Sequence, residues 1–181
     1  MRAFTSPFRI IWIPMLVATV TLAAPMFTRV AAAAAGMERM VTIHDACDPE
    51  SFNAAVGPGT CVRNGGVLFE EFIDQVTKHR FAGAWHFGPP QTDARVGDTF
   101  VAVNRGGEVH TFTEVDEFGG GIIPPLNLLS GNPVPAPECL VLEPDDFVAP
   151  GDTYREPLGE TGTKKFQCCI HPWMRLTAQV K

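Results

Sequence analysis

The chain has 181 residues, with 14 basic and 20 acidic side chains and a formal net charge of −6. Hydrophobic residues make up 45% of it, enough for a domain with a real core. The acidic balance excludes nucleic acid as a favoured partner and suits steering toward a basic protein.

The first 35 residues have the pattern of an export signal. Two arginines precede an apolar run over 10–24, and the small-residue stretch 30–36 offers a cleavage site before Gly36. An uncleaved membrane anchor is the alternative, but the run is shorter than the roughly 20 residues of a span. We expect a periplasmic or secreted protein without stable membrane insertion after cleavage. Its mature chain has 11 basic and 20 acidic residues, a net charge of −9.

Residues 36–83 are expected to form an N-terminal extension to the main domain. The stretch 36–65 is polar and resembles a loop, whereas 67–80 carries apolar residues at helical spacing with acids early and bases late. This pattern predicts one amphipathic helix that packs on something larger. It could cover an open face or edge of the main domain.

Residues 84–181 are expected to form an all-β domain. Short runs rich in Phe, Val and Thr alternate with Gly, Pro and Asp, which is typical of a sandwich or barrel. The Gly/Pro-rich stretch 117–137 is long for a hairpin connection, so we expect a functional or mobile loop there. Cys139 lies just after this stretch and offers a tether.

The chain has five cysteines, an odd number that leaves at least one thiol unpaired. Cys47 and Cys61 flank a turn-rich stretch, and we expect them to pair. Cys139 can then form a disulfide with either Cys168 or Cys169. If the chain is extended there, the side chains of Cys168 and Cys169 point to opposite faces. One of them can then belong to a binding site while the other forms the disulfide.

The segment 168–174, CCIHPWM, brings together a thiol, an imidazole and a thioether. Soft sulfur with imidazole selects copper, and a His₂Cys set with a weak axial Met is the blue-copper arrangement. The second histidine must come from elsewhere. His110 is the best candidate, because it begins a β-rich run after a Gly-Gly turn.

Two stretches, 86–112 and 149–180, resemble the cupredoxins, the small blue copper proteins. The first is similar to the family's strands and first ligand histidine, and the second to its APG turn and Cys-His-Met ligand loop, with the short spacing of amicyanin-type members. The resemblance implies a cupredoxin-like Greek-key β-sandwich over 84–181, joined to the N-terminal amphipathic helix. Thr111 is a departure, since many members have Asn there; its hydroxyl could still bond to the ligand loop.

The resemblance also implies the roles of individual residues. It assigns one Cu(I)/Cu(II) ion per chain to His110, Cys168, His171 and Met174, and leaves Cys169 to pair with Cys139. It further implies that His171 lies near the surface as an electron port, with Pro172 and Trp173 forming an apolar docking patch around it.

The function implied is an exported carrier of single electrons between redox partners that dock transiently. One alternative is a copper-binding module for delivery, storage or sensing. Another is a sandwich of the same fold that binds no copper and uses these side chains in its core. A copper oxidase or nitrite reductase is disfavoured because it needs a second metal site. His86 lacks an evident accompanying histidine pair, and we expect it and His44 to be ordinary side chains.

Overall fold

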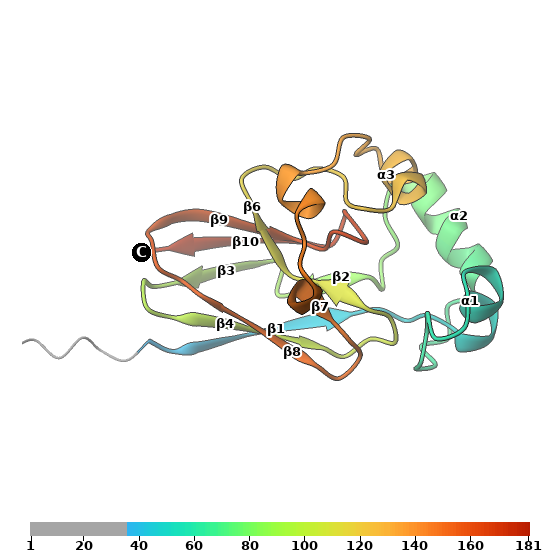
Figure 1. Cartoon of the computed structure of the whole chain (residues 1–181), viewed down its shortest axis with the longest axis horizontal. Coiled ribbons are helices and arrows are strands. Elements are labelled where there is room, and N and C mark those ends of the chain that lie inside the picture. The colour runs from blue at the N-terminus through green and yellow to red at the C-terminus, as the bar shows by residue number, and fades with distance from the viewer. Residues whose placement is uncertain (1–35) are drawn as a thin grey trace, which may run out of the picture. The chain divides into compact units, whose positions relative to one another are not determined.

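The computed structural model describes residues 36–181, which form one compact unit, shown in Figure 1. The export signal expected over 1–35 lies outside the described residues. Among the residues described, no helix is both long and apolar enough to cross a membrane.

Two four-stranded sheets face each other as the layers of a sandwich (Figure 1). The first has the order β2 (His86–Gly88), β1 (Glu38–His44), β4 (Thr99–Asn104) and β8 (Thr153–Pro157). The second has the order β3 (Gln91–Ala94), β10 (Arg175–Val180), β9 (Gly162–Gln167) and β6 (Thr113–Val115). A short pair joins β5 (His110–Thr111) to β7 (Phe147–Val148). The expected β-sandwich is confirmed.

Helical segments gather mainly at one end of the sandwich (Figure 1). They are α1 (Pro49–Ala55), α2 (Phe69–His79) and α3 (Pro124–Ser130), with the 3-10 turns η1 (Pro137–Leu140) and η2 (Pro144–Asp146). The amphipathic helix expected over 67–80 is confirmed as α2, which buries Phe72 and Val76. Glu71 accepts a hydrogen bond from the Leu68 N–H at its start, and Lys78 and His79 lie in its last turn, where the helix dipole favours bases.

Aromatic side chains fill the space between the sheets. Phe112 stacks on Phe166 with ring centroids 4.6 Å apart, and Phe100 meets both rings edge-on. All three are essentially inaccessible to solvent. Burial of such rings is a main source of folding free energy, and it fixes β4, β9 and the segment after β5 relative to one another.

The expectation of a loop over 36–65 is wrong in two places. β1 lies inside the first sheet, parallel to β4 and antiparallel to β2, and its Val41 and Ile43 enter the core. Helix α1 follows, with Asp48 accepting a hydrogen bond from the Ser51 N–H at 2.8 Å as its N-cap. The N-terminal segment therefore supplies part of the sandwich as well as a cover for it.

The long connection over 117–137 also contains regular structure. Residues 124–130 form α3, which begins at two prolines and ends at Gly131 in the left-handed conformation. Asn127 ties the preceding turn to this helix, since its amide accepts from the Gly121 N–H and donates to the Gly121 carbonyl. This part of the connection is packed, whereas the sequence predicts a loop.

Candidate metal centre

Cys168 lies directly after β9 and supplies a buried sulfur atom. Its side chain is fully inaccessible to solvent, and it is the one free cysteine among the described residues. The Thr111 N–H points at the sulfur, with N···S 3.4 Å. Burial acts to raise the pKa of this thiol, but the neighbouring His110 and His171 outweigh it and hold that pKa well below its usual range. The arrangement favours a thiolate, the form in which cysteine binds metals.

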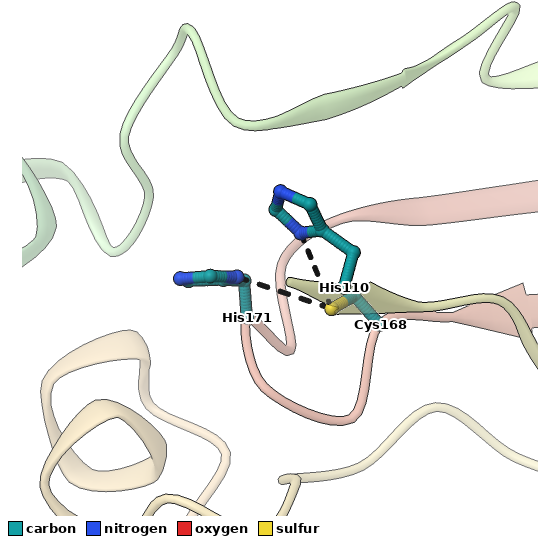
Figure 2. A group of neighbouring side chains, drawn as sticks. All are labelled: His110, Cys168 and His171. Atoms are coloured by element: carbon teal, nitrogen blue, oxygen red, sulfur yellow. Dashed lines mark hydrogen bonds between the residues drawn. The ribbon is translucent and has the colours of Figure 1, made fainter. Parts of the chain in front are cut away.

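The imidazoles of His110 and His171 direct their Nδ1 atoms at this sulfur (Figure 2). His110 Nδ1 lies 3.7 Å from Cys168 Sγ and His171 Nδ1 lies 3.9 Å from it. The three donor atoms all lie within 4.8 Å of one another, and all three residues are buried. One sulfur and two imidazole nitrogens are a donor set suited to copper, so the residues present fit the ion that the sequence predicts.

A buried carboxylate holds the outer nitrogen of His110. Its Nε2 lies 2.9 Å from Asp45 Oδ2, and neither side chain is appreciably exposed. Burial acts to raise the pKa of Asp45, but hydrogen bonds from His110, Glu108 and Gly107 outweigh it and hold that pKa at about 2. Burial acts to lower the pKa of His110, but the hydrogen bonds to Asp45 and Cys168 raise it to about 9. Asp45 thereby orients the ring with Nδ1 toward the sulfur.

A second carboxylate lies behind His171. Glu108 Oε2 is 3.7 Å from His171 Nε2, beyond hydrogen-bond range, and accepts a hydrogen bond from Trp85 Nε1 at 2.6 Å. Burial raises the pKa of the Glu108 carboxyl, against the opposing attraction of His171. Both imidazoles therefore have an acidic residue on the side away from Cys168.

The loop that carries His171 is closed by its own backbone. The Cys168 N–H donates to the Met174 carbonyl at 3.0 Å, and the Met174 N–H donates to the His171 carbonyl at 2.9 Å. Met174 is fully buried at the end of this loop, where β10 begins. The structure thus brings together the donor atoms of three of the four residues for which the sequence predicts metal ligation, His110, Cys168 and His171, while ligation by Met174 stays a prediction.

Thr111 joins the His110 strand to the ligand loop, as the sequence suggests. Its hydroxyl oxygen accepts a hydrogen bond from the Cys169 N–H at 2.8 Å, and its own N–H faces Cys168. The residue is completely buried. A single side chain therefore fixes the spacing between the two segments that supply the sulfur and the first imidazole.

Two disulfides surround the centre, with the pairing that the sequence analysis expects. Cys47 is bonded to Cys61, and Cys139 is bonded to Cys169. The second bond attaches η1 to the residue next to Cys168. Because Cys139 is bonded to Cys169, Cys168 keeps a free thiol that faces the imidazoles.

The expected surface position of His171 is wrong. Its side chain is almost completely buried beneath α2, with ring centroids 6.1 Å from Phe72 and 6.5 Å from Trp85. Pro172 is also buried, so it cannot form part of an exposed patch, and Trp173 is only partly exposed. Trp173 meets the His171 ring at 5.5 Å, and a docking role for it stays a proposal.

A cavity of about 300 Å³ adjoins His171 on the side of the helices. Its lining is mostly apolar, and Glu108 and His171 bring ionisable groups to it. The apolar part of its lining comes from α1, α2 and the residues around α3.

Sequence reasoning missed the two carboxylates. Glu108 stands two positions before His110 in a run read as extended, and side chains two apart share a face of a strand, so this signal was available. Asp45 reaches His110 because β1 lies in the sheet beside β4, and the expectation of a loop there hid it. Gly106 leaves room for the Asp45 side chain, since a Cβ on this glycine would collide with Asp45 Oδ2.

Comparisons with known proteins find similar solved structures, whereas no protein-family model and no curated protein matches the chain. A purple cupredoxin from Nitrosopumilus maritimus is 18% identical, covering 78% of this chain and 98% of its own, with a TM-score of 0.44. Oxidised plastocyanin from Dryopteris crassirhizoma is 14% identical, covering 79% and 100%, with a TM-score of 0.39. A Cu(I) amicyanin mutant is 21% identical, covering 55% and 76%, with a TM-score of 0.36.

Proposed function

We propose that the chain binds one copper ion at the metal centre and carries single electrons between redox partners outside the cytoplasm. The observation that carries this proposal is the convergence of one buried sulfur and two buried imidazole nitrogens, with both histidines backed by carboxylates. Copper bound there would supply a one-electron Cu(I)/Cu(II) couple. His110, Cys168 and His171 would hold the ion, with Met174 as a fourth ligand.

The role of the protein in such a carrier is to hold its donors still. Asp45 and Thr111 fix the His110 strand, the loop hydrogen bonds fix His171, and the Cys139–Cys169 disulfide anchors the residue after Cys168. A site that moves little between two oxidation states exchanges electrons with a small reorganisation cost. The tight tethering of all three donors therefore suits electron transfer.

The buried position of the donors favours a carrier over a delivery module. A delivery protein has to expose its metal to the ligands of an acceptor, whereas His110 and Cys168 are fully inaccessible to solvent. The two disulfides are consistent with an oxidising compartment outside the cytoplasm, as the expected export signal implies.

Trp173 is the residue that we assign to contact with a redox partner. It touches the His171 ring and is partly exposed, so it offers an aromatic route from that ligand toward solvent. The acidic mature chain, with its net charge of −9, favours a partner with a basic surface. A small interface around one aromatic side chain would suit brief docking.

Repeated redox cycling tests the carrier against the delivery module. The mature chain, loaded with one equivalent of copper, is cycled by electrochemistry in the presence of a Cu(I) chelator. We expect a reversible one-electron wave and retention of the copper through the cycles. Transfer of the copper to the chelator on the first reduction would instead support delivery.

A further inference from the structure

Two histidines outside the metal centre face each other across neighbouring strands. His44 at the end of β1 is paired directly with His86 at the start of β2. Their rings are stacked, with centroids 4.7 Å apart and planes inclined by 19°. Directly opposed residues of an antiparallel pair have Cβ atoms about 4.5–5.5 Å apart, so the two imidazoles can reach one ion once the rings turn out of their stack. His44 is thus a histidine partner for His86 that the sequence did not reveal.

We propose that His44 and His86 form a second metal site, at the surface of the first sheet, for a divalent first-row cation. Imidazole nitrogen is a common ligand of Cu(II), Ni(II) and Zn(II), and among these Cu(II) forms the tightest complexes. Two protein nitrogens leave the remaining coordination positions to water or to an incoming molecule.

The hydrogen bonding of His86 favours a free Nε2 for binding a metal. His86 Nδ1 lies 3.2 Å from the Gly83 carbonyl, which can only accept, so this contact favours the tautomer with the proton on Nδ1 and the lone pair on Nε2. His44 lies over Gly88, and its Nε2 would be 3.7 Å from a Cβ at that position. The missing side chain leaves room beside the His44 ring.

Both rings are accessible to a cation from solvent. His86 is exposed and His44 is partly exposed, in contrast to the buried histidines of the metal centre. Burial and the nearby His86 lower the pKa of His44, although Asp45 acts in the opposite direction. The lowered pKa favours the neutral form of His44, which is the form that binds a metal.

The second site is separate from the first but is connected to it. It shares no ligand with the metal centre, yet His44 is followed in the chain by Asp45, whose Oδ2 bonds His110 Nε2 at 2.9 Å. One peptide link and one hydrogen bond therefore join the two sites. A cation at His44 and His86 would add positive charge behind the ligand His110.

Metal titration tests the proposal on the mature chain. The metal centre is first filled with one equivalent of copper, and Cu(II) is then added while binding is followed by calorimetry and paramagnetic resonance. We expect a second equivalent to bind with a nitrogen-coordinated Cu(II) signal. The second equivalent should be lost in His44→Gln and in His86→Gln, and retained in His79→Gln, which removes a histidine from α2.

Two results would overturn the second site. One is the binding of a single equivalent by the unmodified chain, and the other is a second equivalent that persists with equal affinity in both glutamine variants. Repeating the titration with Cys168→Ser separates this proposal from the proposed function. That variant should still bind Cu(II) at His44 and His86 whatever happens at the metal centre, because the two sites share no ligand.

Discussion

Asp45 places a negative charge behind His110 of the metal centre, and the carboxyl group of Glu108 lies behind His171. Asp45 accepts hydrogen bonds from the Gly107 and Glu108 N–H groups as well as from His110, so its position is fixed from three directions. A carboxylate behind a ligating histidine makes the imidazole a stronger donor and favours the more highly charged metal ion. Asp45 is thus expected to stabilise Cu(II) relative to Cu(I).

Asp45→Asn tests this effect with little change in shape. We expect copper affinity to fall by about 10–100-fold, the usual effect of removing such a partner. We also expect the reduction potential to rise, because the loss of a negative charge stabilises Cu(I). The measurements are competition with a chelator and voltammetry. Asp74→Asn, on the exposed face of α2, is the matched control, and a potential equal to that of this control would contradict the role of Asp45.

The sequence predicts those parts of the metal centre that local patterns reveal. Cys168, His171 and Met174 fall within one loop, so their spacing alone indicates a site, and His110 follows from the strand pattern that precedes it. Asp45 lies 65 positions from His110 and meets it only through the pairing of β1 with β4. Local spacing carries no information about such a contact.

At the scale of elements, α2 acts as the cover of the metal centre. Its Phe72 contacts Phe52, Trp85 and Trp173 as well as the ring of His171. The helix is recognisable in the sequence because its apolar residues recur at helical spacing. What it covers was not predictable, because the amphipathic pattern shows only that one face is buried and does not identify its partner.

Phe72→Ala should weaken both the fold and the cover. Removing a buried phenylalanine costs about 3–5 kcal/mol, and here it would also enlarge the cavity beside His171. We expect a lower free energy of unfolding by chemical denaturation and faster loss of copper to a chelator. Phe81→Ala removes an exposed ring just after the same helix and should change neither quantity. Equal behaviour of the two variants would show that α2 does not protect the centre.

Asp98 ties the start of β1 to the turn before β4. Its carboxylate accepts hydrogen bonds from the Met37 N–H at 2.8 Å, from Arg39 Nε at 2.8 Å and from the Arg95 N–H at 3.1 Å. The hydrogen bond from Met37, followed by that from Arg39, lowers the pKa of Asp98 from 3.8 to about 2. A depressed pKa contributes stability above pH 3.8 that is lost as the pH falls through about 2.

The acid stability of the metal-free chain should therefore fall between about pH 4 and pH 2. Asp98→Asn removes this titration, so we expect it to be less stable at pH 7 and to lose less stability across that window. Thermal unfolding at a series of pH values measures both effects. The exposed Asp145→Asn should follow the unmodified chain, and an identical profile for Asp98→Asn would refute the contribution of Asp98.

At the scale of the whole molecule, the N-terminal segment and the β domain are interleaved. β1 lies between β2 and β4, while α1 and α2 lie at one end of the sandwich (Figure 1), where Phe72 of α2 packs against His171. The alternation of buried Val41 and Ile43 with partly exposed neighbours was present in the sequence, but the polar residues that follow obscured it. The class of fold follows from local patterns, whereas the parallel pairing of β1 with β4 is a contact between distant segments.

The most direct test is the visible absorption of the mature chain with one equivalent of Cu(II). We predict an intense thiolate-to-copper band that is absent in Cys168→Ser. The matched control is Cys139→Ser combined with Cys169→Ser, which removes the neighbouring disulfide without creating a new thiol and should keep the band. A folded chain that binds no copper, or that keeps the band in Cys168→Ser, would contradict the assignment of the metal centre.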